Sequence, residues 1–87
     1  MATNRNDEIR KEVLFQHWAI KAPLCAAEIH RECQKRRMDY SHQECREAQE
    51  FLADDGLLSA VQMPGSSAQF FRINSNGQRH YEQTYAA

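Results

Sequence analysis

The chain has 87 residues, of which 41% are hydrophobic and 26% charged, and its formal net charge is −1 at pH 7. A chain of this length fits one small domain, so we expect no multidomain enzyme. No apolar run reaches the roughly 18–20 residues of a membrane span, and the N-terminal residues show no signal-peptide profile. We therefore expect a cytoplasmic protein that does not contact a membrane. Three cysteines at irregular spacing argue against a secreted disulfide framework.

The first predicted helix covers residues 7–20, with Asn6 as its N-cap and a frayed tail over residues 1–6. Its apolar residues fall on several faces instead of one stripe, so this helix needs contacts on more than one side. It lies either at the centre of the domain or in a dimer interface. We expect a homodimer, and the residues predicted at its interface are Leu14, Trp18, Tyr81 and Tyr85. The alternative is that Leu14 and Trp18 pack under a C-terminal helix through Tyr81.

A turn over residues 22–25 precedes a second predicted helix over residues 26–37. The clearest local signal follows, in the sequence Ser41-His42-Gln43-Glu44. This is a capping box, in which the serine hydroxyl accepts from the Glu44 amide and the Glu44 carboxylate accepts from the Ser41 amide. The third helix that it opens carries inward-facing Cys45, Ala48 and Leu52, with Phe51 at the edge of that arc. Gly56 is suited to the left-handed position just past the end of this helix.

After Gly56 the pattern changes to that of two strands, over residues 57–62 and 69–73, joined by turn-forming residues 63–68. Alternation predicts that Phe71 and Ile73 point inward and that Phe70 and Arg72 point outward. Asn74 or Ser75 can cap a short final helix that carries Tyr81 and Tyr85 on one side.

This order of elements resembles the winged helix-turn-helix domains of bacterial and phage regulators over residues 7–84. Three stretches carry the resemblance, namely Ala22-Pro23-Leu24-Cys25-Ala26-Ala27-Glu28-Ile29, Phe51-Leu52-Ala53-Asp54-Asp55-Gly56-Leu57-Leu58 and Phe71-Arg72-Ile73-Asn74-Ser75-Asn76-Gly77-Gln78-Arg79. The resemblance implies a single, mainly α domain with a small β-hairpin, in which a three-helix core is followed by a two-stranded wing and a short C-terminal helix. It also implies a transcription regulator that binds double-stranded DNA, with the 42–54 helix as recognition helix and the 58–73 hairpin as wing.

Two sets of residues follow as candidates for contacts with DNA. The outward arc of the recognition helix would contact bases through His42, Gln43, Arg46, Glu47 and Glu50. Glutamine, arginine and glutamate can pair with adenine, guanine and cytosine respectively. The DNA backbone would be contacted by Lys35, Arg36, Arg37, Ser66, Ser67 and Arg72. The basic triplet 35–37 is explained equally well as an ordinary helix C-terminus, where the helix dipole favours cations.

The distribution of charge opposes DNA binding. Residues 41–58 carry one arginine and five carboxylates, so the candidate recognition helix and its exit are the most acidic part of the chain. Affinity for DNA comes largely from neutralising phosphates, which carboxylates oppose. The alternative hypothesis is a winged-helix module that binds a protein partner through this acidic helix and an exposed Phe70.

No metal, cofactor or catalytic function is predicted. Cys25, Cys33 and Cys45 with His30 and His42 match no compact ligand spacing, and the cysteines are better explained as small buried residues. We expect no enzyme, because no nucleophile–base pair or Gly-rich phosphate loop is evident. All the histidines, which are His17, His30, His42 and His80, are predicted to be surface or cap residues.

Overall fold

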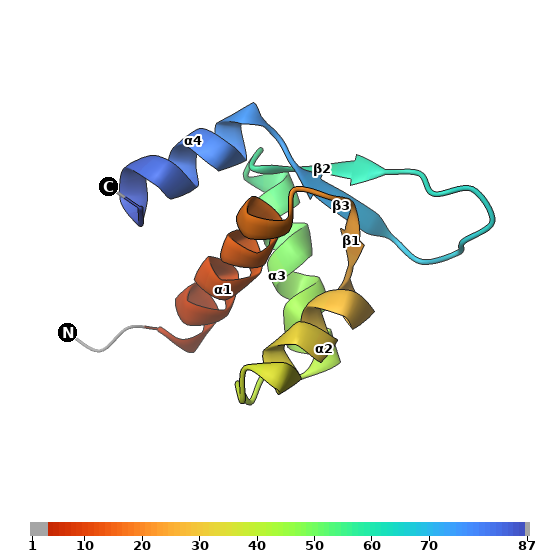
Figure 1. Cartoon of the computed structure of the whole chain (residues 1–87), viewed down its shortest axis with the longest axis horizontal. Helices are drawn as coiled ribbons and strands as arrows, with labels where there is room; N and C mark the ends of the chain where they lie inside the picture. The colour runs from red at the N-terminus through yellow and green to blue at the C-terminus, as the bar shows by residue number, and fades with distance from the viewer. Residues whose placement is uncertain (1–3, 87) are drawn as a thin grey trace.

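The computed structural model describes residues 4–86 as four helices and a three-stranded antiparallel sheet (Figure 1). In chain order the elements are α1 Arg5–Ile20, β1 Leu24–Cys25, α2 Ala26–Lys35, α3 His42–Asp54, β2 Leu58–Val61, β3 Phe70–Ile73 and α4 Ser75–Thr84. This mainly α architecture confirms the predicted fold class. Within residues 4–86, no helix has both the length and the hydropathy needed to cross a bilayer.

Helix α1 begins earlier than predicted. Asn4, not Asn6, is the N-cap: its extended backbone precedes the helix and its side chain accepts a hydrogen bond from the Asn6 amide at 2.7 Å. Residues 4–6 are therefore ordered by a cap, and the prediction of a frayed tail was wrong for them, while residues 1–3 lie outside the described range. Asp7 and Glu8 occupy the first turn, where their carboxylates interact favourably with the positive end of the helix dipole.

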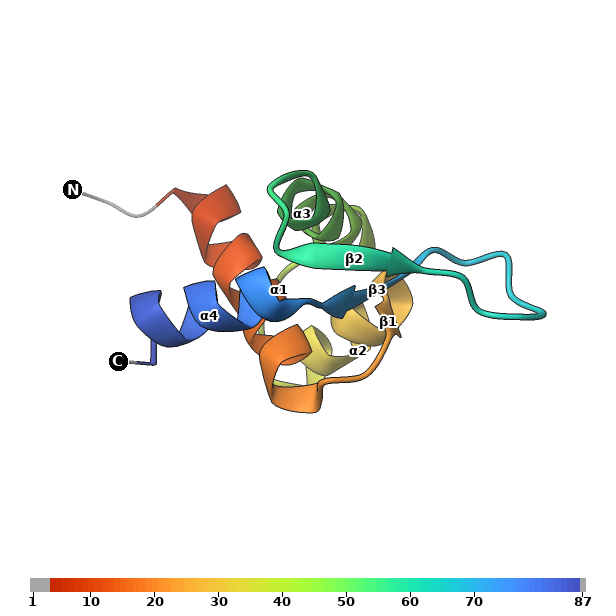
Figure 2. The ribbon, with the colours of Figure 1, turned by 90° about the horizontal axis from the view of Figure 1, so that it is seen from above.

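The multi-sided apolar pattern of α1 is explained by its central position, because it contacts α3, α4 and β3 (Figures 1 and 2). Ile9, Val13 and Leu14 are almost fully buried, whereas Ile20, at the last turn, is 48% exposed. The hydrophobic core gathers these α1 residues with side chains of every other helix and of all three strands.

The same packing corrects the predicted dimer interface. Leu14 is 1% exposed and Tyr81 is 8% exposed within a single chain, so neither has surface to offer a second copy. Trp18 is half-buried and stacks on Tyr81, with ring centroids 4.8 Å apart, while its indole Nε1 donates to Glu82 at 3.2 Å. This is the alternative of packing beneath the terminal helix. Tyr85 remains 40% exposed. The homodimer itself stays a prediction.

The sheet has the order β1-β3-β2, and its third strand was not expected. The sequence predicts a turn at residues 22–25, yet Leu24 and Cys25 pair with Phe71 and Phe70 as a short strand. Two residues are too few to show the alternation that identifies a strand. The wing between β2 and β3 extends beyond the body of the domain (Figure 2).

Alternation along β3 agrees with the sequence in most positions. Phe71 and Ile73 are buried and Arg72 is exposed, as predicted. Phe70 was predicted to point outward and exposed, but it is half-buried, since it lies between Cys25 and Val61 in the sheet register.

Helix α2 is shorter than predicted, because it ends at Lys35 with Arg36 as its C-cap. Arg37 follows in a left-handed conformation, with φ at 60°, which turns the chain toward α3. Gly56 has φ at 81° after the end of α3, which confirms its predicted left-handed position.

The N-terminus of α4 packs directly on the base of the wing. Asn74 is the N-cap, and its side chain accepts from the Gly77 amide at 2.9 Å. A Cβ on Gly77 would lie only 2.1 Å from the carbonyl oxygen of Leu57. Only glycine fits at this close approach of helix to backbone.

The stacking of Trp18 on Tyr81 predicts that Trp18→Ala lowers the free energy of unfolding by about 2 kcal/mol, since the residue is half-buried within its own chain. Urea unfolding followed by circular dichroism measures the change. Ile20→Ala, at an exposed position on the same helix, is the matched control and should change stability by less than about 0.5 kcal/mol. A lower molar mass in light scattering without a loss of stability would instead place Trp18 at a dimer interface.

Candidate nucleic-acid interface

The start of α3 is fixed by the predicted capping box. The Ser41 hydroxyl accepts from the Glu44 amide at 3.1 Å, and the Glu44 carboxylate accepts from the Ser41 amide at 3.0 Å. Cys45, Ala48 and Leu52 face the core, as predicted. The opposite side of the helix is therefore free, and all five predicted base-contacting residues are exposed on it, namely His42, Gln43, Arg46, Glu47 and Glu50.

A groove of about 380 Å³ runs between α3, the N-terminus of α2 and the wing. On α3 it is lined by His42, Arg46 and Glu50, which lie one above another at intervals of four residues. The wing contributes Ser67 and Gln69 from the segment that returns to β3. Ser67 was predicted as a contact residue but Gln69 was not, because a turn segment shows no periodicity that would assign it a face.

Glu47 belongs to a different surface. It lines a hollow between α3 and α1, together with Glu44, Asn6 and Arg10. Gln43 is engaged within the helix, since it accepts a hydrogen bond from the Arg46 guanidinium at 2.8 Å. The structure therefore divides the predicted base-contacting set: His42, Arg46 and Glu50 share the groove, and Glu47 lies away from it.

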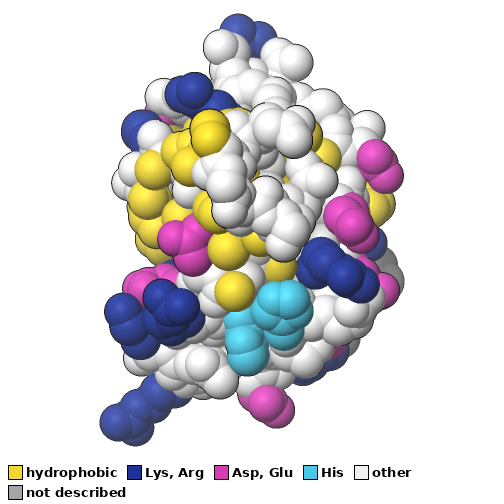
Figure 3. All heavy atoms as spheres, turned by 90° about the vertical axis from the view of Figure 1, so that its right-hand side faces the viewer, with side chains coloured by type: hydrophobic (Ala, Val, Ile, Leu, Met, Phe, Trp, Pro, Cys, Tyr) yellow, Lys and Arg dark blue, Asp and Glu magenta, His cyan; other side chains and the backbone are white. Residues whose placement is uncertain are grey.

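Two histidines meet where α2 and α3 approach each other. The rings of His30 and His42 lie edge to face, with centroids 6.0 Å apart. Figure 3 shows histidine side chains grouped between two sets of lysine and arginine side chains on the side of the molecule from which the wing projects. Acidic side chains lie beside both of these sets, so the charge on this side of the molecule is mixed.

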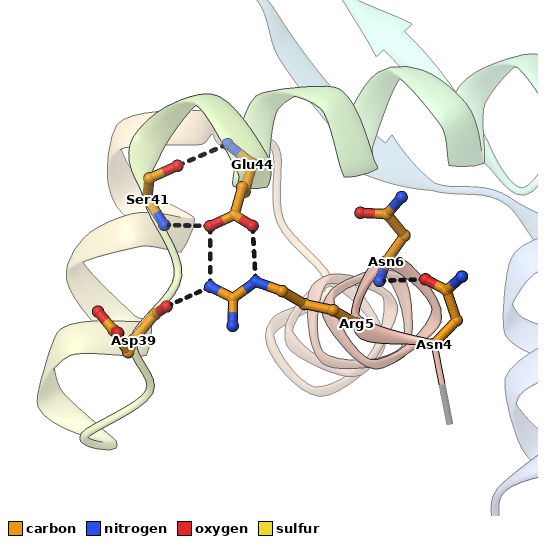
Figure 4. Close-up of polar contacts among 6 residues, drawn as sticks. All are labelled: Asn4, Arg5, Asn6, Asp39, Ser41 and Glu44. Carbon is orange, nitrogen blue, oxygen red and sulfur yellow. Dashed lines mark hydrogen bonds and ion pairs between the residues drawn. The ribbon is translucent and has the colours of Figure 1, made fainter. Parts of the chain in front are cut away.

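Most of the carboxylates that made α3 appear acidic do not act on this groove. Glu44 forms an ion pair with Arg5, and the two residues share two hydrogen bonds of 2.8 and 3.1 Å (Figure 4). The hydrogen bonds from Arg5 and from the Ser41 backbone lower the pKa of Glu44 to about 2. Asp54 and Asp55 lie at the far end of the helix. Among the groove-lining residues of the described chain, Glu50 is the single carboxylate.

The predicted backbone-contacting residues are scattered. The guanidinium of Arg36 points to α1, where it pairs with Glu12 at 2.5 Å and lies 4.8 Å from the centroid of the Phe15 ring. Lys35 and Arg37 lie with it at the C-terminal end of α2, about 15 Å along the helix from the end that lines the groove. Arg72 is on the face of the sheet opposite Phe71, which lines the groove. Ser66 does not line the groove and lies in a hollow formed by residues of the wing alone.

A buried polar contact between two side chains supports the groove, and it was not predicted from the sequence. His17 was predicted to be a surface or cap residue, which is wrong, since it and Gln49 are both 0% exposed. The Gln49 amide donates to the Leu24 carbonyl at 3.2 Å and lies 3.0 Å from His17 Nε2. When the Gln49 amide donates to His17, Nε2 of His17 is the acceptor and the imidazole is neutral. Burial favours this neutral form, because it lowers the pKa of His17 to about 4. This link connects α1, α3 and β1.

The cysteines are placed as small core residues would be. Cys33 and Cys45 are fully buried, as predicted, and Cys25 is half-buried at the N-cap of α2. Cys33 Sγ accepts from the Gln16 amide at 3.3 Å. Between residues 4 and 86, no three histidine, cysteine or acidic side chains converge in a way that could hold a metal ion.

Comparison with known proteins gives one informative match. No protein-family model matches the chain, and no curated protein sequence matches it. Among solved structures, GAS PerR in its Zn-Zn form is similar, with a TM-score of 0.60 and 15% sequence identity. The match covers 84% of this chain and 44% of the PerR chain, so this chain spans less than half the length of that protein. The likeness establishes that the fold is a winged helix.

The buried, neutral His17 predicts a dependence of stability on pH. Its pKa in the folded protein, about 4, lies below that of an unfolded chain, so the unfolded state binds the proton more tightly. Its contribution is complete above about pH 7, and the free energy of unfolding should fall by about 2 kcal/mol as pH drops to about 5. Urea unfolding at a series of pH values measures this change.

His17→Gln removes the titrating group, so it should flatten the pH dependence between these limits. His80→Gln, at an exposed position on α4, is the control and should leave the wild-type slope unchanged. Equal slopes in the wild type and His17→Gln would contradict the assignment.

Proposed function

We propose that this chain is a winged-helix protein that binds double-stranded DNA, with α3 in the major groove and the wing beside it, and that it regulates transcription. The observation that carries the proposal is the division of α3 into two sides. His42 and Arg46 face the open groove toward the wing, while Glu44 is paired with Arg5 and Glu47 faces α1. The likeness to the solved structure of GAS PerR, which covers 84% of this chain, supports the winged-helix fold on which the proposal rests.

This division answers the electrostatic objection. Only Glu50 places a carboxylate on the groove side, so the net charge of α3 overstates the repulsion that a phosphate would meet there. Arg46 can form a bidentate contact with guanine, and Gln69 of the wing or Gln43 can pair with adenine. The exposed serine hydroxyls of the wing suit contacts with phosphate oxygens. Specificity in this proposal therefore depends more on base contacts than on charge.

The alternative, a module that binds a protein partner through an acidic α3 and the wing, has less support. That hypothesis relied on Phe70 being exposed for a partner to contact. In the structure Phe70 is half-buried in the sheet. Its acidic surface is reduced by the pairing of Glu44 with Arg5.

The proposed protein acts by binding, without catalysis, on DNA in the cytoplasm of a bacterium or a phage-infected cell. A homodimer would double the number of phosphate contacts that one copy can make. With Leu14 and Tyr81 buried, its interface would use the exposed Tyr85 rather than the four-residue set predicted from the sequence.

Titration of a labelled mixed-sequence duplex tests the proposal. Binding should be detectable at micromolar protein in about 50 mM salt, and the logarithm of the association constant should fall against the logarithm of salt with a slope steeper than about −2. Arg46→Ala should weaken binding to a duplex selected from a random pool by about 1–3 kcal/mol. Arg79→Ala, which removes an exposed arginine from α4, is the control. Absence of binding at low salt would refute the proposal.

The two glutamates of α3 provide a matched pair. Glu50→Gln removes the carboxylate of the groove, so it should strengthen binding to mixed-sequence DNA by about threefold to tenfold. Glu47→Gln removes the same charge from the side that faces α1, so it should change affinity by less than about twofold. Fluorescence polarisation at low salt compares the two. Equal effects would show that position around the helix is irrelevant, and that the groove is not where DNA lies.

A further inference from the structure

We propose that Arg5 is a positioning residue for DNA recognition: it holds the first turn of α3 against α1 and masks the negative charge of Glu44. This inference rests on the proposed function, in which α3 enters the major groove. Arg5 lies 39 residues from Glu44 in sequence and is the first residue of α1. Its position in a segment expected to fray gave no reason to assign it a role.

The contacts of Arg5 join the second half of the connection between α2 and α3 to the first turn of α3. Its Nε and Nη2 donate to the two carboxylate oxygens of Glu44, and Nη2 also donates to the carbonyl oxygen of Asp39 at 2.6 Å (Figure 4). The guanidinium carbon lies 5.4 Å from the centroid of the Tyr40 ring. One planar cation thus contacts two residues of the connection and the third residue of the helix. Lysine, with a single ammonium, cannot reproduce this fork of bonds.

Glu44 connects this contact to the start of α3. The same oxygen, Oε1, accepts from Arg5 and from the amide of Ser41, so the capping box and the ion pair share one carboxylate. Asn4, which caps α1, fixes the position from which Arg5 reaches across. The N-terminal ends of α1 and α3 are therefore joined through one arginine side chain (Figure 4).

The first turn of α3 carries His42 and Gln43, and Arg46 follows one turn later. A recognition group loses its contact when it is displaced by about 1 Å, so the register of this turn determines which bases are contacted. Loss of Arg5 would also leave Glu44 as an unpaired carboxylate on a helix that approaches phosphates. Both effects weaken recognition without a direct contact between Arg5 and DNA.

A purely structural role predicts a different pattern. The Arg5 side chain is 54% exposed, and an exposed ion pair contributes little to the stability of a fold. Removal of Arg5 should therefore change DNA binding much more than it changes the midpoint of urea unfolding. This difference separates positioning from general support of the fold.

The experiment compares Arg5→Ala, Arg5→Lys and Glu44→Gln with Lys11→Ala, which removes a cation of α1 that lies over the Tyr85 ring. Affinity is measured for a duplex that the wild type enriches from a random pool and for a mixed-sequence duplex. In Arg5→Ala, the ratio of the affinity for the enriched duplex to the affinity for the mixed-sequence duplex should fall by about tenfold, which is the equivalent of one well-placed base contact. Arg5→Lys should recover only part of this ratio, and Lys11→Ala should retain it.

Glu44→Gln keeps an acceptor for the Ser41 amide and removes the ion pair. Its effect and that of Arg5→Ala should not add in the double variant, because both remove the same interaction. Additive effects, or a ratio in Arg5→Ala equal to that of Lys11→Ala, would overturn the proposal.

Hydrogen exchange without DNA gives an independent measurement. The amides of Glu44 and Cys45 bond to Ser41, so they should exchange faster in Arg5→Ala, while the amide of Leu57, bonded to Leu52, should not change. Unchanged exchange at Glu44 and Cys45 would overturn the positioning of α3. If the wild type enriches no duplex, the proposed function fails, and the exchange rates still decide whether Arg5 positions the helix.

Discussion

The place at which α3 begins is the constraint on which the rest of this structure depends. Ser41 and Glu44 satisfy each other's backbone amides, so the helix starts at His42 and at no neighbouring residue. This start determines which side chains face the core and which face outward, because a helix shifted by one residue would rotate every position by about 100°. With Leu52 inward, Arg46 lies on the outward side of the helix, where it lines the groove beside the wing.

The effect of charge on such a helix depends on which face carries each charged side chain, and not only on the net charge of the segment. A count over residues 41–58 gives an acidic segment. In three dimensions, Glu44 is compensated by a cation from α1, and Glu47 lines the hollow between α3 and α1. Of the α3 carboxylates, Glu50 alone lines the groove. The same composition could belong to a protein that repels DNA or to one that binds it. The arrangement around the helix axis distinguishes the two.

Much of the fold could be predicted from local signals in the sequence. The capping box at Ser41, the left-handed Gly56 and the cap at Asn74 each act within a few residues, and the structure confirms all three. The two-residue strand β1 could not be predicted, since its pairing partner lies in β3 and it is too short to show alternation.

The polar interactions of the site were harder to predict, because they join distant residues. His17 and Gln49 are polar, so composition placed His17 outside, yet the Gln49 amide nitrogen and His17 Nε2 meet in the core. A signal did exist for Gln49, which falls on the same helical face as Cys45, Ala48 and Leu52. No such signal links Arg5 to Glu44 or Arg36 to Glu12, because each pair is made only when separate helices are brought together.

The absence of a side chain at Gly77 has a mechanical consequence. The carbonyl oxygen of Leu57 lies too close to Gly77 for a Cβ there to fit. The Asn74 side-chain amide also donates to the Gly56 carbonyl and to the Ser59 hydroxyl. The last helix and the root of the hairpin are therefore tightly packed together. The N-terminal turn of α4 and the root of the hairpin are expected to move together as one rigid unit. A displacement of the N-terminal turn of α4 would therefore carry the root of the hairpin with it.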